Sequence, residues 1–89
     1  MSCHYDFFSV EVSSKTIKPL LSAGIKRDKI TQHRTGYRTY GYGYRAKTYP
    51  VYAYYATVGY TEQNGDPDSI ARVWRDKGLN AHVKYHCVD

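Results

Sequence analysis

The first hydrophobic pattern along the chain has a period of two. Even positions from Phe8 to Val12 are apolar, and polar residues occupy the odd positions between them. Successive side chains of a strand point to opposite faces of a sheet, so this alternation predicts a strand over residues 4–12 with one buried face. Two serines at positions 13 and 14 end the pattern.

A short helix is predicted to follow. Thr16 is a suitable N-cap, Pro19 fits the first turn because no hydrogen bond is lost there, and Gly24 favours the end of a helix. The apolar face would consist of Ile17, Leu20 and Leu21. Residues 26–35 are basic and weakly patterned, and are compatible with a loop, an extension of the helix or a short strand.

Tyrosine, threonine and valine dominate the centre of the chain. These residues suit a pleated sheet surface, so two long strands are predicted over residues 36–49 and 51–61. Pro50 lies between them and marks the expected turn, because proline is rare inside paired strands.

The second predicted helix has clear boundaries. In the turn-forming run 64–67 (Asn-Gly-Asp-Pro), Asp66 is a good N-cap and Pro67 a good first helical residue. Gly78 favours the end of this helix. Its predicted buried face carries Ile70, Val73 and Trp74 at helical spacing.

The chain closes with a predicted strand over residues 81–88. Its two faces would carry Ala81, Val83, Tyr85 and Cys87 on one side and His82, Lys84 and His86 on the other. The order strand, helix, strand, strand, helix, strand predicts a single α+β domain over residues 1–89. The expected architecture is an antiparallel sheet with both helices on one face, in the ferredoxin-like βαββαβ order, with the first and last strands paired.

Positive charge is concentrated in one segment. The whole chain has a net charge of +5, yet residues 26–47 alone contain seven Lys or Arg and one acid, a local net charge of +6. No acidic residue occurs from Lys29 to Thr61. A concentrated excess of this kind favours an anionic partner, either nucleic acid or an acidic protein.

Tyrosines overlap with this basic segment, since nine of the eleven lie between Tyr37 and Tyr60. In a strand, the tyrosines of residues 40–44 would share one face, and the glycines between them would let a helix approach the other. Rings on an open face can stack on nucleobases, and flanking cations can hold phosphates. The predicted nucleic-acid-binding residues are Arg34, Arg38, Tyr40, Tyr42, Tyr44, Arg45 and Lys47.

Part of this segment resembles the RNA-recognition motif. Residues 41–44 (Gly-Tyr-Gly-Tyr) reproduce the glycine-aromatic centre of the motif that this family carries on a central strand. The chain departs from the motif at Tyr40, Arg45 and Lys47, and a further strand-like segment precedes the second helix. The resemblance covers about half of one motif and does not assign the chain to the family.

No catalytic or metal-binding motif is recognisable. Two Cys-His pairs lie near the chain ends, Cys3 with His4 and His86 with Cys87. Adjacent strand residues point to opposite faces, which disfavours a zinc site even if the terminal strands pair, and no cofactor is expected. Without a signal-peptide pattern or an apolar run of membrane length, the expectation is a cytoplasmic protein with reduced thiols and no membrane partner.

Three functional hypotheses follow. The first is a non-catalytic protein that binds single-stranded nucleic acid through a Tyr/Arg-rich β-hairpin. The second is a phage-type inhibitor or adaptor that binds a host protein through the same tyrosine-rich surface. The third is a toxin-type ribonuclease, which would use histidine as acid or base and arginine to stabilise phosphate. The candidates for that chemistry are His33, His82, His86 and Arg45.

Overall fold

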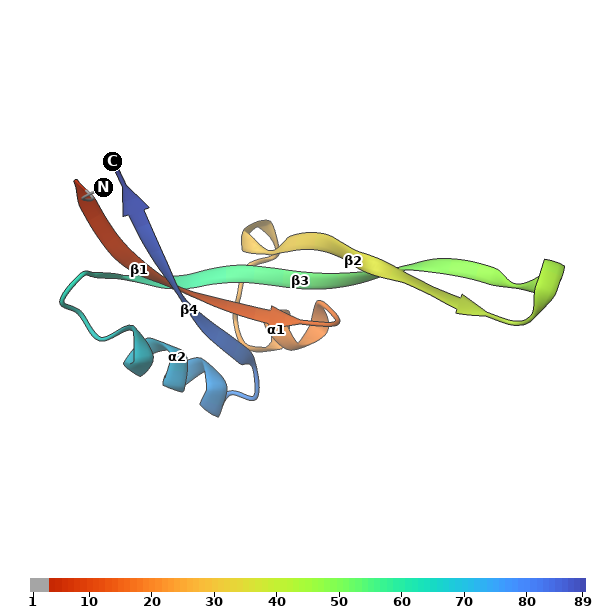
Figure 1. Ribbon diagram of the computed structural model, residues 1–89. Coiled ribbons are helices and arrows are strands. Elements are labelled where there is room, and N and C mark those ends of the chain that lie inside the picture. The colour runs from red at the N-terminus through yellow and green to blue at the C-terminus, as the bar shows by residue number, and fades with distance from the viewer. Residues whose placement is uncertain (1–3) are drawn as a thin grey trace.

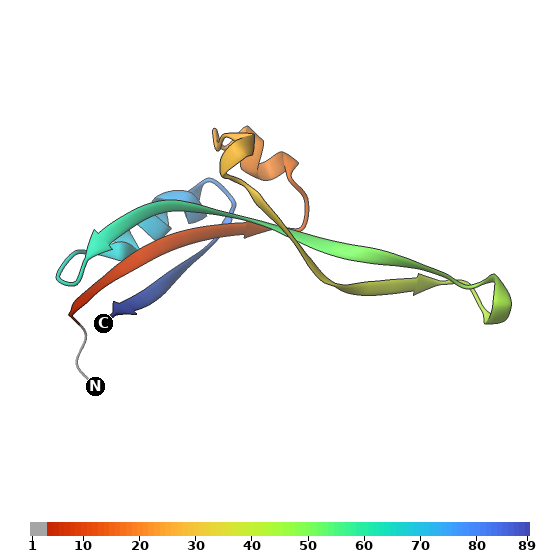
Figure 2. The same ribbon diagram turned by 90° about the horizontal axis from the view of Figure 1, so that it is seen from above.

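Four antiparallel strands form one sheet, and two helices lie on one of its faces (Figure 1, Figure 2). The computed structural model describes residues 4–89. The strands are β1 (Tyr5–Ser14), β2 (Thr31–Tyr40), β3 (Lys47–Glu62) and β4 (Asn80–Val88), and the helices are α1 (Lys18–Ser22) and α2 (Pro67–Asp76). Short 3-10 turns occupy Arg27–Lys29 and Gly43–Arg45. The strands are arranged in the order β2-β3-β1-β4.

The α+β class and the antiparallel four-stranded sheet are therefore confirmed. The arrangement departs from a simple ferredoxin-like one in two ways. Helix α1 has only five residues, and the β2–β3 hairpin continues beyond the end of β1. The outer part of the β2–β3 hairpin consequently lacks the second layer that such an architecture would supply (Figure 2).

Both helices contribute to one hydrophobic core on the same face of the sheet. Val10 and Val12 of β1 have no exposed surface, as the alternating pattern predicts, and neither has Leu20 of α1. Burying each of these side chains contributes about 1.5–3 kcal/mol. The buried cluster consists of Val10, Val12, Leu20, Ala56, Ala71, Leu79 and Ala81.

Helix α2 begins at the predicted residue. The Ser69 N–H donates a hydrogen bond to Asp66 Oδ1 at 3.3 Å, and the Ser69 hydroxyl donates to the second carboxylate oxygen. These bonds favour the ionised carboxylate, so they hold the pKa of Asp66 below its ordinary value of 3.8. The cap assignment is confirmed.

The buried face of α2 differs from the prediction. Val73 is 54% exposed, whereas Ala71 is fully buried and Trp74 is half-buried against the core. Val73 lies about 200° around the helix axis from Ala71, so it points to solvent once the small side chain of Ala71 faces the sheet. The close approach is visible at Gly59 of β3, where an added Cβ would lie 3.1 Å from Ile70 Cγ2.

Helix α1 lacks the predicted threonine cap. Its N-cap residue is Ile17, which makes no side-chain capping bond. The Thr16 N–H instead donates to Ser14 Oγ at 3.4 Å, so Thr16 belongs to the turn that leaves β1. Pro19 lies in the first turn of the helix, as expected.

The position of the hairpin turn corrects the prediction most clearly. Strand β2 already begins at Thr31, and the chain reverses over residues 41–46 rather than at Pro50. Pro50 instead pairs with Tyr37 inside β3. Proline is tolerated there because β1 ends opposite Tyr54, which leaves the other edge of β3 without a strand that would need its N–H.

The molecule is elongated. Its principal extents are 56 × 35 × 21 Å, and its Cα radius of gyration is 17.1 Å. A compact chain of this length would have a radius of gyration of about 12 Å. Within residues 4–89, no helix combines the length and the apolar character needed to cross a membrane.

The first and last strands pair as predicted, from Tyr5 opposite Val88 to Ser13 opposite Asn80. Cys87 at the end of β4 is disulfide-bonded, which corrects the expectation of a reduced thiol. Cys3, whose thiol was likewise expected to be reduced, lies outside the described residues. Because structural disulfides are rare in reducing compartments, the thiol argument no longer supports a cytoplasmic location.

Candidate nucleic-acid interface

The β2–β3 hairpin projects from the rest of the molecule as an arm. We define the arm as residues 33–53, which lie beyond the last pair between β1 and β3 (Figure 1). The remainder of the described chain is called the body. All seven residues predicted to bind nucleic acid lie in the arm: Arg34, Arg38, Tyr40, Tyr42, Tyr44, Arg45 and Lys47.

Strand pairing and cross-strand contacts hold the arm together without a helix. The rings of Tyr40 and Tyr49 meet edge-on with centroids 5.8 Å apart. The hydroxyls of Thr39 and Thr48 lie 3.1 Å apart in a hydrogen bond. Cross-strand pairs of this kind each contribute about 0.2–1 kcal/mol. These contacts pre-form the arm while leaving most of its side chains in solvent.

The tip of the arm carries the most exposed rings of the molecule's described part. Tyr42 and Tyr44 are 94% and 95% exposed. They follow glycines whose backbone lies in the left-handed region, with φ of +94° at Gly41 and +58° at Gly43. Glycine adopts these angles without a Cβ clash, which is why the chain turns here.

This geometry corrects the predicted role of the glycines. They make the turn and do not open a strand face to a helix, since an added Cβ at Gly43 would meet nothing within 4 Å. Only Tyr40 of the three tyrosines lies in a strand, so Tyr40, Tyr42 and Tyr44 do not form one row. The likeness to the RNA-recognition motif, which belongs to a central strand, therefore falls on a turn.

Cations of the arm lie beside its rings. The Arg34 guanidinium is 5.0 Å from the ring centroid of Tyr37, and that of Arg45 is 5.9 Å from the centroid of Tyr44. The ring face attracts the cation and limits its conformations while leaving its N–H donors exposed. With no carboxylate between Lys29 and Thr61, these donors have no internal anionic partner in the arm.

A second surface, not included in the sequence prediction, lies on the sheet face opposite the helices. We call this the open face. The Phe7 and His86 rings stack with centroids 4.7 Å apart and an interplanar angle of 12°. Tyr5 and Tyr60 flank Phe7 at 5.5 and 6.1 Å. These four residues, Tyr5, Phe7, Tyr60 and His86, are called the platform.

A signal for the platform was present in the sequence. Tyr5 and Phe7 alternate with the buried residues of β1, and His86 alternates with the apolar positions of β4. Tyr60 was harder to place, because a bulge between Val10 and Glu11 of β1 shifts the register with β3. Simple alternation along β3 fails at this bulge, which puts Tyr60 opposite Ser9.

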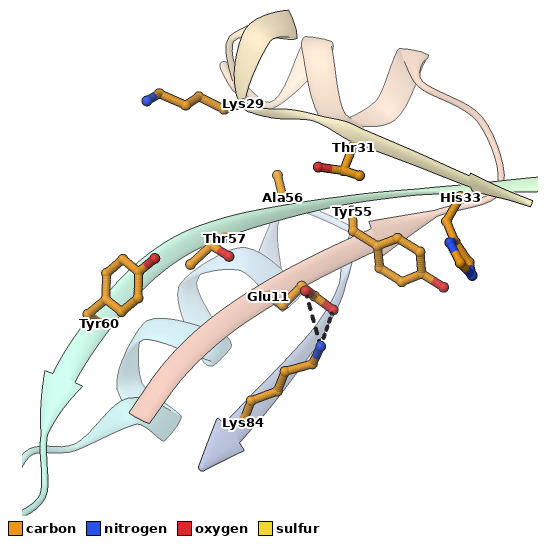
Figure 3. Close-up of a pocket in the computed structure, with 9 residues that line it drawn as sticks. All are labelled: Glu11, Lys29, Thr31, His33, Tyr55, Ala56, Thr57, Tyr60 and Lys84. Carbon is orange, nitrogen blue, oxygen red and sulfur yellow. Dashed lines mark hydrogen bonds and ion pairs between the residues drawn. The ribbon is translucent and has the colours of Figure 1, made fainter. Parts of the chain in front are cut away.

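The open face is hollowed where the arm joins the body (Figure 3). Tyr55 and Tyr60 of β3 border this hollow, and Thr57 lies between them. Lys84 Nζ lies 3.2 Å from Glu11 Oε1, so the two charges at its lower rim offset each other. His33 of the arm approaches the edge of the Tyr55 ring, with centroids 6.4 Å apart.

The candidates for ribonuclease chemistry are not brought together. Arg45 lies at the tip of the arm, whereas His82 and His86 lie in β4 at the other end of the molecule (Figure 1). His86 is hydrogen-bonded to Ser9, with 2.7 Å between Ser9 Oγ and His86 Nε2. Among the residues that the structure describes, no three His, Cys, Asp or Glu side chains form a metal-binding group.

Comparison with known proteins adds no relative, because no protein-family model, curated protein or solved structure matches this chain.

Proposed function

We propose that this protein is a non-catalytic binding module whose arm contacts single-stranded nucleic acid. The observation that carries the proposal is the projection of four cations and several exposed rings on an arm without a carboxylate. Phosphates require cations, and unpaired bases stack on aromatic rings, so one arm presents both chemical groups that a nucleic-acid strand needs.

The cations proposed to bind phosphate and the rings proposed to stack on bases lie at different positions along the arm. Arg38 and Lys47 lie on neighbouring strands near its outer half, where each can approach a phosphate from a paired backbone. Tyr42 and Tyr44 stand at the tip with free ring faces. Arginine can hold a phosphate through two parallel N–H bonds, which adds orientation to the attraction between charges.

Charge-matched variants test the proposal. The arm variant carries Arg38→Gln, Arg45→Gln and Lys47→Gln. The control carries Lys18→Gln, Arg27→Gln and Arg72→Gln, three exposed body cations. Both triple variants lower the net charge from +5 to +2. Binding of labelled single-stranded RNA and DNA is measured by fluorescence anisotropy at two salt concentrations.

We expect the arm variant to lose binding and the control to retain most of it. Equal losses would mean that net charge alone attracts the strand, and would refute the role of the arm. A parent protein that binds neither RNA nor DNA at low salt would refute the function itself, and would leave an acidic protein as the partner of the basic arm. A shortened oligonucleotide would contradict the non-catalytic assignment.

For the fold, we propose that the body is a reduced ferredoxin-like unit from which the arm extends. The element order and the position of both helices on one sheet face support this assignment. An experimental structure in which α1 packs on the opposite face of the sheet from α2 would contradict it.

A further inference from the structure

We infer that the platform on the open face binds unpaired nucleobases of the same strand that the arm holds by its phosphates. This inference rests on the proposed function, since it assigns a second contact surface to the same ligand. The platform lies at the opposite end of β3 from the tip of the arm. Because only an unpaired base can stack on the platform, the platform would select single strands over duplexes. The arm's cations alone cannot make this distinction, since both ligands carry phosphates.

The platform is pre-organised. His86 is fixed on one side by its stack on Phe7 and on the other by the hydrogen bond to Ser9. Ser9 is only 4% exposed, although it lies on the open face, because the neighbouring rings cover it. A ring whose conformation is already fixed loses little entropy when a base stacks on it. Tyr60 is 68% exposed, so its ring is available to a ligand.

The platform's lack of charge favours bases over phosphates. The platform residues carry no fixed charge, and Lys84 beside them is paired with Glu11, whereas Lys29 borders the hollow at the junction with the arm. The platform itself therefore attracts neither the phosphate backbone nor a strongly acidic protein, and a cation for the backbone lies beside it. Nucleobases are neutral and flat, and every base has a π-face, so aromatic rings of this kind suit them.

Strand β3 connects the platform to the arm. From Lys47 to Thr57 its odd positions share one sheet face by alternation, and the bulge then returns Tyr60 to that face. Tyr55 and Tyr60 therefore border one hollow on the open face, whereas Tyr49, farther along the twisted arm, lines a separate groove beside Ile17. At about 3.4 Å per residue the 16-residue strand spans roughly 50 Å.

The predicted ligand is a strand with unpaired bases. In a duplex both faces of each base are already stacked on neighbouring base pairs, so a base must leave the helix before it can stack on a protein ring. The hollow between Tyr55 and Tyr60 offers space beside the platform for the connecting backbone (Figure 3).

The experiment uses the full chain and two platform variants, Tyr60→Ala and Phe7→Leu. Tyr85→Ala is the matched control, because Tyr85 is a similarly exposed tyrosine that contacts Phe8 on the opposite sheet face. Each variant is titrated with a labelled 16-nucleotide single strand, as RNA and as DNA, and with the duplex of the same sequence. Circular dichroism and thermal melting check that each variant is folded.

We expect Tyr60→Ala to weaken single-strand binding at least about fivefold with an unchanged salt dependence. Binding of the duplex should be the same for this variant and the parent. A folded Tyr60→Ala protein with parental affinity for both single strands would overturn the platform. Loss of binding in the arm variant (Arg38→Gln, Arg45→Gln and Lys47→Gln) would at the same time leave the proposed function intact. A parent that binds no strand would overturn both.

A measurement on the unaltered chain covers the case in which a variant does not fold. Stacking of a base places the His86 and Phe7 ring protons in the shielding region above an aromatic face. We expect upfield shifts of these protons in the NMR spectrum when the single strand is added. Ring-proton signals that stay in place at saturation would refute base stacking on the platform.

Discussion

Strand β3 runs through both the body and the arm, but its side chains have different surroundings in the two regions. In the body, β3 contributes Ala56, which is buried beneath two helices, whereas in the arm the same strand carries Tyr49 and Tyr52 in solvent. The body has a core and therefore determines stability. The arm has cross-strand contacts but no second layer, so most of its side chains remain in solvent.

A high tyrosine content is therefore not by itself a sign of a core. Most of the arm's rings remain exposed, while the fully buried side chains are the small and aliphatic ones of β1, α1 and α2. Tyrosine suits such an arm because its ring supports strand pairing and its hydroxyl tolerates water. Mutations that act on one region and spare the other can test this division between body and arm.

The largest expected effect lies in the body. Leu20→Ala removes a fully buried side chain and should lower the free energy of unfolding by about 2–5 kcal/mol, a large part of the stability of a small domain. Tyr42→Ala in the arm should change it by less than about 0.5 kcal/mol. Urea unfolding followed by circular dichroism measures both. Similar losses for the two variants would contradict the division between body and arm.

The next effect concerns binding through the arm. Tyr42→Ala and Tyr44→Ala should each reduce the free energy of single-strand binding by about 1–3 kcal/mol, because each removes a ring on which a base can stack. The melting temperature should stay at the parental value. If a folded double variant binds as tightly as the parent, stacking at the tip is wrong and the rings serve another purpose.

A smaller effect concerns phosphate contacts. Arg38→Ala should weaken binding for every sequence and should flatten the dependence of log K on log salt by about 0.7, the value of one phosphate contact on a single strand. Arg72→Ala on the exposed side of α2 is the control and should leave that slope unchanged. An unaltered slope for Arg38→Ala would exclude this side chain from the phosphate contacts.

The smallest effect concerns the pH dependence of the body. The pKa of Asp66 is lowered in the folded state by its bonds to Ser69, so the cap stabilises the fold above the ordinary pKa of 3.8. This stabilisation is lost as the pH falls through the lowered pKa. Asp66→Ala should therefore melt below the parent near neutral pH, and the two curves should converge in strong acid. A constant difference across the acid range would contradict the assignment.

Several elements were predictable because their signals are local. The alternation in β1 marked its buried face, and the turn before α2 contained its cap and its first residue. The hairpin turn was not predictable in the same way. Pro50 is a strong local breaker, but whether a strand tolerates proline depends on whether a neighbour needs its N–H. Strand β3 has no such neighbour at Pro50 because β1 stops at Ser14. Where β1 stops is a property of the whole sheet and cannot be read from the residues around Pro50.

The candidate site was likewise predictable in its residue content but not in its arrangement. The cations and rings of the arm are evident from the sequence, because charge and ring content do not depend on folding. They are Arg34, Arg38 and Arg45 with the tyrosines around them. Their arrangement into two strands and an exposed tip required the register of β2 and β3. The platform depended still more on tertiary structure. Phe7, Tyr60 and His86 come from three strands that are distant in sequence, and a bulge decides which face one of them occupies.

The residue content of the basic, tyrosine-rich segment, the α+β class and the bounds of the second helix follow from the sequence, because propensity, alternation and capping act over a few residues. Where the chain turns, which rings are exposed and which side chains meet follow from the tertiary structure. Those outcomes depend on strand register and on where neighbouring strands end. Both are set by contacts between residues far apart in the chain, such as the pairs that β1 makes with β3 and β4.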